Sequence, residues 1–218
     1  MDGQRAYCRC YLYGAGGHSR VVEESLRAIG YEVVGRIDDS PHLNPPILPG
    51  IRLTGLDSIP SVFDPIVIAI GCNEDRAFIS NHLKATFISV FHPTAIISPS
   101  SSIAPGTVIL HGAIIQAYSH IGSAVIINTA ASVGHDCEIA DYVHISPGVR
   151  LCGQVTIGEG TQVGAGAIII PGITIGRWST VGAGAVVIED VPDFCTVVGN
   201  PARIVNYRIA ESSAPEPN

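Results

Sequence analysis

The stretch Ile157-Gly158-Glu159-Gly160-Thr161-Gln162-Val163-Gly164-Ala165-Gly166-Ala167-Ile168 decides the fold, because it repeats one pattern of six residues. In each unit an aliphatic residue comes first, a glycine follows it, and a small or β-branched residue stands four places after the aliphatic one. Neither the period of two of a strand nor the 3.6-residue period of a helix produces this register. A short fixed repeat indicates a solenoid, in which each unit buries its apolar face by stacking on the next.

The same register extends from residue 97 to residue 187. Its aliphatic positions are Ile97, Ile103, Ile109, Ile115, Ile121, Ile127, Val133, Ile139, Ile145, Leu151, Ile157, Val163, Ile169, Ile175, Val181 and Val187. One large and one small inward side chain per unit describe a flat face of a triangular prism, so three units make one coil. About five coils at the strand spacing of ~4.8 Å predict a column roughly 24 Å tall.

Residues 1–91 show a different pattern, in which short β-favouring runs alternate with helical spacing. The strands are expected at residues 7–13, 31–37, 66–70 and 87–90, and the helices at 19–29 and 74–83. This alternation predicts a small Rossmann-like parallel α/β sheet. The expected organisation is an α/β domain over 1–91, a parallel β-helix over 92–192, and a C-terminal segment and tail over 193–218.

The composition narrows the class of protein. Charged residues make up 14% of the chain and the net charge is −7, which argues against a nucleic-acid partner because that would call for a basic stripe. The six cysteines have irregular spacing, with no pair of C-x-x-C motifs to hold zinc. Neither a signal peptide nor an apolar run long enough to span a membrane is evident. We therefore expect a reduced, cytoplasmic protein.

A glycine-rich turn, Gly14-Ala15-Gly16-Gly17-His18, stands between the first expected strand and helix. The backbone N–H groups of such a turn and the helix N-terminus can cradle a phosphate. Asp38 or Asp39 ends the next strand, where a carboxylate for a ribose or base would fall. Because Ser19 stands where a dinucleotide motif has its third glycine, a redox cofactor is disfavoured. The alternative reading is a tight turn without a ligand.

His135 stands out among the histidines because Asp136 follows it directly. Transfer of an acyl group to an amine or hydroxyl requires a base, and an imidazole can take up a proton near neutral pH. A neighbouring carboxylate can fix its tautomer and stabilise the imidazolium. Asp136 is the first candidate for that role and Glu138 the second. The alternative is an inert histidine on the outer surface of a solenoid.

The repeats at 157–168 and the ending Val198-Gly199-Asn200-Pro201-Ala202-Arg203 resemble those of the hexapeptide-repeat sugar acetyltransferases of the PglD/PerB/NeuD kind. The resemblance implies a left-handed β-helix, a homotrimer with active sites between subunits, and acetyl-CoA as co-substrate. It implies acetylation of an amino group of a nucleotide-activated sugar, or of a hydroxyl of sialic acid.

The resemblance also implies roles for individual residues. The family motif has an asparagine seven residues before the catalytic histidine, an acidic residue directly after it, and a second histidine nine residues later. Asn128, His135, Asp136 and His144 match these spacings, with His135 as general base and Asp136 as its orienting carboxylate. Asn128 is assigned to the substrate and His144 to the acetyl donor. Gly153, one coil after His135, would offer its backbone N–H to the thioester carbonyl.

The ligand contacts implied by the resemblance fall into two further sets. The positions matching the nucleotide site are Gly14, Gly16, Gly17, His18, Asp38 and Asp39. The positions expected to approach CoA in a groove between subunits are Gly164, Ala165, Gly182, Ala183 and Arg203. Solenoid corners also need glycines to reach positive φ, which is a purely structural reason for Gly164 and Gly182.

Several functions are consistent with these residues. The favoured one is N-acetylation of a UDP-4-amino-4,6-dideoxy sugar, and the alternatives are O-acetylation of sialic acid or another sugar and a non-catalytic scaffold or regulatory subunit. A zinc site of three histidines, as in carbonic anhydrases of this fold, is not supported, because the solenoid histidines are nine, fifteen and nine residues apart and none stack one coil apart. No metal is therefore predicted.

Overall fold

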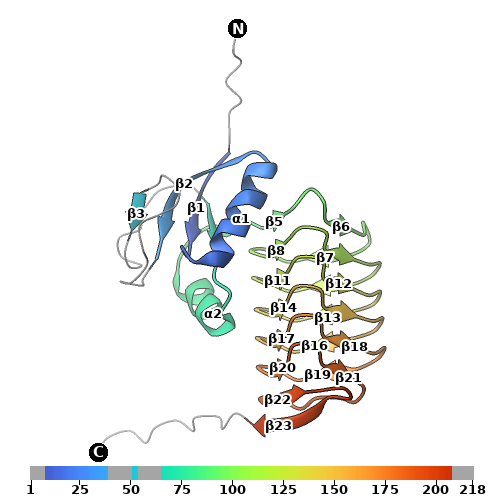
Figure 1. Ribbon diagram of the computed structural model, residues 1–218. Helices are drawn as coiled ribbons and strands as arrows, with labels where there is room; N and C mark the ends of the chain where they lie inside the picture. The colour runs from blue at the N-terminus through green and yellow to red at the C-terminus, as the bar shows by residue number, and fades with distance from the viewer. Residues whose placement is uncertain (1–7, 39–50, 54–64, 208–218) are drawn as a thin grey trace, which may run out of the picture.

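The computed structural model describes residues 8–38, 51–53 and 65–207, as an α/β domain beside a three-sided β-solenoid (Figure 1). Asp39, the proline-rich stretch 41–50 and the C-terminal tail from residue 208 lie outside the described residues. Neither helix among the described residues is long and apolar enough to cross a membrane.

The N-terminal sheet is parallel, with strand order β3-β2-β1-β4. Its strands are β1 (Cys8–Tyr13), β2 (Tyr31–Ile37), β3 (Ile51–Leu53) and β4 (Ile66–Ile68), and its helices are α1 (Gly17–Ala28) and α2 (Asn73–His82). The expected strands at 7–13, 31–37 and 66–70 and both expected helices are therefore present, with β3 in addition. The expected strand at 87–90 is wrong: Phe87 makes a single bridge to Ile66, and Val90 already pairs with the solenoid.

The solenoid has three faces of short strands, each paired in parallel with the strand one coil away except for the last strand of the first face, which is antiparallel. The first face holds β5 (Val90–Phe91), β8 (Val108–Ile109), β11 (Ile126–Ile127), β14 (His144–Ile145), β17 (Gln162–Val163), β20 (Thr180–Val181), β22 (Cys195–Val198) and β23 (Arg203–Tyr207). The second holds β6 (Ile96–Ile97), β9 (Ile114–Ile115), β12 (Ser132–Val133), β15 (Arg150–Leu151), β18 (Ile168–Ile169) and β21 (Val186–Val187). The third holds β7 (Ser102–Ile103), β10 (His120–Ile121), β13 (Glu138–Ile139), β16 (Thr156–Ile157) and β19 (Thr174–Ile175).

The core of the solenoid is built from the repeated inward positions. The aliphatic series from Ile109 to Val187 is buried, as are the small residues between its members, such as Ala131 and Cys137. Ile97 and Ile103 are only half-buried, because no coil precedes them on their faces. The second face has six strands, so the prediction of about five coils is approximately right. The domain limits at residues 91 and 192 stay predictions, although β5 pairs as a solenoid strand.

The corners turn by a left-handed residue that recurs every six positions. From residue 106 to residue 184 this residue has positive φ in every unit: Gly106, Gly112, Tyr118, Ala124, Ala130, Asp136, Tyr142, Gly148, Gln154, Gly160, Gly166, Gly172, Trp178 and Gly184. Side chains other than glycine occupy many of these corners, at a cost of about 1–2 kcal/mol each. The packing between coils must therefore hold these corners in place.

Gly164 and Gly182 are absent from this left-handed series, so the idea that they serve positive φ is wrong. A Cβ on Gly164 would lie 2.5 Å from the backbone nitrogen of Ala183 in the next coil. A Cβ on Gly182 would lie 2.7 Å from a methyl group of Val198. These glycines are required because the following coil or strand lies directly against them.

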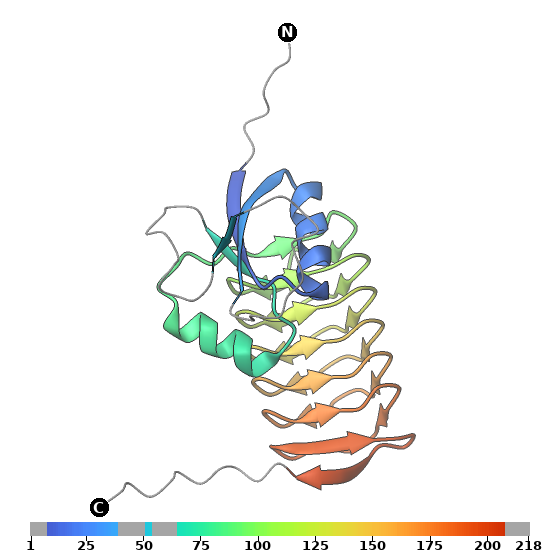
Figure 2. The ribbon, with the colours of Figure 1, turned by 60° about the vertical axis from the view of Figure 1, so that its left-hand side comes forward.

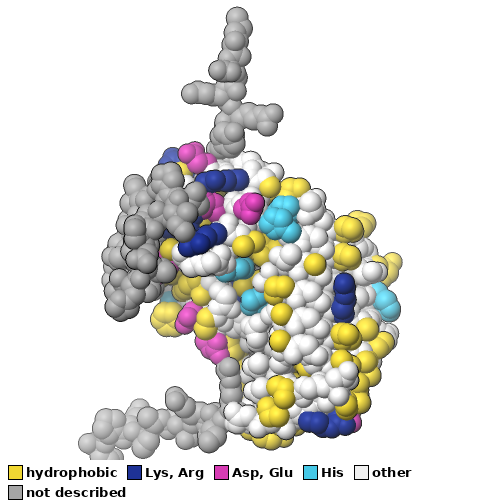
Figure 3. Space-filling model, viewed as in Figure 1, with side chains coloured by type: hydrophobic (Ala, Val, Ile, Leu, Met, Phe, Trp, Pro, Cys, Tyr) yellow, Lys and Arg dark blue, Asp and Glu magenta, His cyan; other side chains and the backbone are white. Residues whose placement is uncertain are grey.

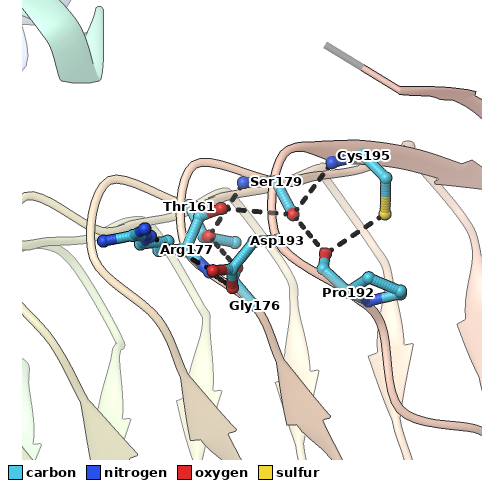
Figure 4. Close-up of polar contacts among 7 residues, drawn as sticks. All are labelled: Thr161, Gly176, Arg177, Ser179, Pro192, Asp193 and Cys195. Carbon is cyan, nitrogen blue, oxygen red and sulfur yellow. Dashed lines mark hydrogen bonds and ion pairs between the residues drawn. The ribbon is translucent and has the colours of Figure 1, made fainter. Parts of the chain in front are cut away.

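Buried hydroxyls tie successive coils together at their corners (Figure 4). Thr161 Oγ1 donates to the carbonyl of Gly176 at 2.6 Å and accepts from the N–H of Ser179 at 3.1 Å. Ser179 Oγ repeats the arrangement, donating to Pro192 O at 2.7 Å and accepting from Cys195 N at 3.2 Å. Each buried hydroxyl thus uses its donor and an acceptor site, which avoids the cost of an unpaired polar group in the core.

The N-terminal domain lies against the first face of the solenoid (Figure 2). Val22 and Leu26 of α1 belong to one core cluster with Val108 and Leu110 of the solenoid. Helix α2 lies further along, at the corner between the third and first faces, where Asn73 Nδ2 donates to Gly160 O at 2.9 Å. The two domains therefore share a core, and their junction runs along the solenoid axis.

The two kinds of corner glycine predict different responses to alanine. Gly166→Ala meets open space but keeps positive φ, so it should lower the free energy of unfolding by about 1–2 kcal/mol. Gly164→Ala forces a Cβ into the backbone of the next coil and should cost more, about 3 kcal/mol. Thermal unfolding of the two variants measures the difference. Equal melting temperatures would contradict the close-approach role of Gly164.

Candidate active site

His135 and Asp136 lie at the corner between the second and third faces, between β12 and β13. The Nδ1 atom of His135 is 2.6 Å from Oδ2 of Asp136. With the carboxylate accepting a hydrogen bond from Nδ1–H, the other ring nitrogen, Nε2, is left to take up a proton. Both side chains are accessible, at 61% and 49% exposure, so a substrate from outside the chain can reach them.

Gly153 lies directly against the His135 ring, one coil further along the chain. A Cβ built on Gly153 would lie 2.4 Å from Nε2 and 2.5 Å from Cε1 of the imidazole. The absence of a side chain at Gly153 is therefore what allows the ring to occupy this position. The sequence predicted this juxtaposition from the length of a coil.

Asn128 and His144 form a second group, on the first face and the corner beside it. Asn128 Nδ2 is 3.0 Å from His144 Nε2, and the side-chain oxygen Oδ1 of Asn128 accepts from Thr129 N at 2.8 Å. His144 Nδ1 is 3.4 Å from the carbonyl oxygen of Gly71, in the turn before α2. His18 of α1 completes the group, with its ring centroid 6.3 Å from that of His144. Figure 3 shows histidine side chains along this junction of the two domains.

Burial keeps both histidines of this group neutral. Burial, with a smaller contribution from the Arg76 charge and then from His18, lowers the pKa of His144 to about 4. Burial followed by Arg76 lowers the pKa of His18 to about 4 as well. Among the described residues, Nε2 of His18 is buried without a hydrogen-bond partner. At neutral pH this group therefore presents uncharged imidazoles.

The two pairs of motif residues thus lie in different parts of the prism: His144 on the first face with Asn128 at the corner after it, and His135 with Asp136 at the next corner. Asn128 and His144 face the N-terminal domain, whereas His135 and Asp136 point outward from the corner between the other two faces. Within one chain, His135 therefore contacts Asp136 and Asn128 contacts His144, but the two pairs are not in contact with each other.

In the glycine-rich turn, Gly14 has φ +113° and donates its N–H to Ile37 O at 2.7 Å. A Cβ on Gly14 would lie 2.7 Å from Ala69 O, so glycine is required there. Gly16 and Gly17 are exposed and have open space above them, and α1 starts at Gly17 with no acidic residue in its first turn. The positive end of this helix is thus open to an anion.

The carboxylate of Asp38 also belongs to this turn, because its Oδ2 accepts from Ala15 N at 2.7 Å. Asp38 therefore ties the end of β2 to the glycine-rich turn. The structure does not test its predicted contact with a ribose or base.

The positions predicted to approach CoA lie at the corner between the first and second faces. Ala165 and Ala183 are exposed on successive coils, with Gly164 and Gly182 half-buried beside them. Arg203 begins β23 and is exposed near the end of this column, where the adjacent Ala202 N donates to Val186 O. The structure thus brings these predicted residues to one edge of the solenoid.

Two known family models match the chain. The model "PglD N-terminal domain" matches residues 9–83, and "Bacterial transferase hexapeptide (six repeats)" matches residues 154–189. The curated GDP-perosamine N-acetyltransferase of Escherichia coli O157:H7 is 37% identical over 78 residues, a match that spans 36% of this chain and 35% of that protein.

Solved structures match over nearly the whole length. One is a mutant perosamine N-acetyltransferase from Caulobacter crescentus in complex with CoA and GDP-perosamine, with a TM-score of 0.85 and 35% identity over 90% of this chain and 96% of that one. Another is the acetyltransferase domain of PglB from Neisseria gonorrhoeae FA1090 in complex with acetyl coenzyme A, with a TM-score of 0.85 and 38% identity over 92% and 100% of the two chains.

The chain belongs to the PglD/PerB-like hexapeptide acetyltransferases. The predicted family and fold, an α/β domain followed by a left-handed β-helix, are confirmed. The predictions of an acetyltransferase and of acetyl-CoA as the acyl donor are confirmed with them. Within the described residues, no group of three or more histidine, cysteine or acidic side chains could hold a metal ion.

Sequence reasoning missed one residue of this acetyltransferase, Arg76 of α2. Its side chain is 1% exposed and donates to backbone carbonyls of both domains, including Ala124 O at 2.7 Å and Tyr142 O at 2.6 Å. The sequence carries no signal for this role, because Arg76 follows Glu74 and Asp75 and resembles a surface charge on a helix.

A cavity of about 270 Å³ adjoins the His144 group, between the start of α2 and the solenoid. It is lined by Cys72, Asn73, Glu74, Gly160, Gln162, Trp178, Ser179 and Thr180. Gln162 pairs with His144 across β14 and β17, so the cavity continues the first face beyond that histidine. Trp178 lies over Gly160 in this cavity.

The contact between Gly153 and the imidazole predicts a selective loss of activity. Gly153→Ala would displace the His135 ring, which is exposed and can move, so we expect little change in stability. A displacement of about 1 Å should lower kcat by about 100-fold. Steady-state kinetics and thermal unfolding of the same sample test this. A variant that keeps wild-type kcat would contradict the positioning of His135 by Gly153.

Proposed function

We propose that this acetyltransferase transfers the acetyl group of acetyl-CoA to the amino group of a nucleotide-activated amino sugar, in sites formed between neighbouring copies of a homotrimer. The observation that carries the proposal is the division of the motif between the first face with its adjoining corner and the corner between the second and third faces. His135 with Asp136 provides a base, and the group around Asn128 and His144 lies beside the open turn at Gly16. We place the reaction in the cytoplasm, where the six free cysteines stay reduced.

In the proposed reaction, His135 acts as the general base. The sugar nitrogen attacks the thioester carbon, and Nε2 of His135 takes a proton from that nitrogen as the new C–N bond forms. Asp136 stabilises the resulting imidazolium through the 2.6 Å contact at Nδ1. The tetrahedral intermediate collapses with cleavage of the C–S bond, and the leaving CoA thiolate takes the proton from His135. The backbone N–H of Gly153 is the proposed donor to the carbonyl oxygen.

The choice of an amino sugar rests on the relatives. The Caulobacter crescentus enzyme is a perosamine N-acetyltransferase and its structure holds GDP-perosamine. The proposed phosphate site is the turn at Gly16 and Gly17, with Asp38 and His18 nearby. Our sequence interpretation favoured a UDP-4-amino-4,6-dideoxy sugar, and a direct comparison of UDP- and GDP-sugars decides between the two nucleotides.

The first experiment measures thiol release from acetyl-CoA with UDP-4-amino sugars, GDP-perosamine and sialic acid offered in parallel. We expect turnover with a nucleotide-linked amino sugar, and a loss of at least about 100-fold in kcat in His135→Ala. Turnover with sialic acid alone would overturn N-acetylation in favour of the O-acetyltransferase alternative. Release that persists in His135→Ala would remove that residue from the role of base.

A second copy is needed because the two halves of the motif point away from each other. A cyclic trimer would place the His135 corner of one protomer against the Asn128 group and N-terminal domain of the next. Each protomer would then contribute its base to one site and its Asn128 half to another. The groove between the protomers would also be the place for CoA, along the edge that carries Ala165 and Ala183.

Subunit complementation tests this arrangement. His135→Ala and Asn128→Ala should each be inactive alone, because each breaks one half of every site. Co-refolded or co-expressed mixtures should recover about a quarter of wild-type activity, since one site in four combines two intact halves. Thiol release by the unfractionated equimolar mixture, per total protein, measures the recovery.

The matched control mixes Asn128→Ala with His144→Ala. Both changes fall on the same half, so every site stays broken and no activity should return. Recovery in this control, or none in the first mixture, would contradict a site shared between subunits.

Asp136→Asn separates the charge of the carboxylate from the shape of the corner. Asparagine tolerates the φ of +56° found at Asp136, so the fold should be kept. Loss of the negative charge should lower kcat by about 10- to 100-fold, less than for a buried catalytic carboxylate because Asp136 is half exposed. Steady-state kinetics at saturating acetyl-CoA provides the measurement. An unchanged kcat would assign the orienting role to another carboxylate.

A further inference from the structure

We propose that Arg76 is a positioning residue that fixes the turn at residues 70–73. The carbonyl of Gly71 in this turn then holds His144 in one neutral tautomer, and His144 in turn orients the Asn128 amide toward the substrate. This inference rests on the proposed function, because it concerns how the Asn128 half of that site is held. Arg76 thus affects the substrate indirectly, through Gly71, His144 and Asn128.

The guanidinium of Arg76 joins three segments of the chain. Nη1 donates to the carbonyls of Ile70 at 3.1 Å and of Gly71 and Cys72 at 3.3 Å each. Nε and Nη2 donate to Ala124 O at 2.7 Å and Tyr142 O at 2.6 Å, in consecutive coils of the solenoid. Because one planar group makes all these bonds, the position of the Gly71 carbonyl relative to the solenoid depends on Arg76.

His144 is hydrogen-bonded to both Gly71 and Asn128, and the groups at the two ends of this series determine which atom is the donor in each bond. The carbonyl of Gly71 can only accept, so the His144 nitrogen facing it, Nδ1, carries the proton. The N–H of Thr129 can only donate, so the Asn128 atom facing it is the oxygen, and the amide NH2 faces His144. Nε2 of His144 therefore accepts from Asn128 at 3.0 Å.

Because Asn128 is the donor to His144, one N–H of its amide remains for a ligand. The amide has two N–H groups; one is used by His144, and the half-buried side chain presents the other at the edge of the first face. The same bond makes Nε2 of His144 an acceptor, so His144 cannot donate to an acetyl carbonyl from that nitrogen. The donor of this half of the site is Asn128.

The surrounding charges keep the arrangement neutral. The groups that face His144 are Arg76 from α2 and His18 from α1. Burial first, then the charge of Arg76 and lastly His18, lowers the pKa of His144 from 6.5 to about 4. The pKa of Arg76, lowered to about 10 by burial, still leaves it charged at neutral pH. A proton on Nε2 would remove the acceptor for Asn128, so the bond should persist from neutral pH down to about pH 5 and be lost near pH 4.

Nitrogen-15 NMR of histidine-labelled trimer tests the tautomer without any substrate. In the wild type we expect His144, identified by comparison with His144→Gln, to carry its proton on Nδ1 and to remain neutral from pH 8 to about pH 5. Arg76→Met should move its titration upward toward 6.5, because the positive charge and the clamp are both removed. Arg76→Lys, which keeps the charge but lacks the planar fork, should give a smaller shift.

Asn128→Asp tests the direction of the bonds even if the Arg76 variants fail to fold. A carboxylate facing Nε2 would accept rather than donate, so His144 should carry both protons at neutral pH. Arg27→Lys is the matched control, because Arg27 is an exposed arginine that pairs with Glu23 on α1. It should leave the His144 signals and kcat unchanged.

Kinetics provides the second readout. Arg76→Lys should lower kcat by about tenfold with little change in KM for acetyl-CoA. Two NMR results would overturn the proposal: a wild-type His144 protonated on Nε2, or an Arg76 variant that is folded and has unchanged His144 signals. Because NMR needs no substrate, failure of the proposed reaction would show in the turnover assay alone.

Discussion

Stacking in fixed register, with each residue against the one eighteen positions along the chain, is the constraint on which the rest of this molecule depends. Parallel pairing repeats it on every face, as between His144 and Gln162. It places the ring of His135 on Gly153 and the backbone of one coil against Gly164 in another. The same repetition that builds the core therefore also fixes the position of the candidate base, without any dedicated loop.

The junction between the domains follows a different principle. A buried guanidinium is costly unless its donors are satisfied, and Arg76 meets this requirement with Oδ1 of Asn73 in α2 and with backbone carbonyls of the preceding turn and of two solenoid coils. The two solenoid carbonyls, of Ala124 and Tyr142, come within reach only when the N-terminal domain is seated on the solenoid. Arg76 thus links correct docking of the domains to the geometry of the first face.

The repeat made most of the fold predictable, because its period appears directly in the residue types. The contact of His135 with Gly153 followed from the same period. Strand β3 was missed because it is short and follows a proline-rich stretch. Arg76 was missed because its partners are backbone carbonyls, which leave no trace in residue types. The corners held by residues such as Tyr118 and Gln154 were unpredictable from propensity, since the packing of coils overrides the preference for glycine.

The end of the solenoid is closed by a change in the direction of the chain. Strand β22 continues the parallel stack on β20, but β23 returns antiparallel to it. An antiparallel strand spaces its hydrogen-bonding groups differently from a parallel one, so it is a poor template for another coil. A repeat that could in principle add coils without limit, joining molecules end to end into a fibre, is thereby terminated within one chain.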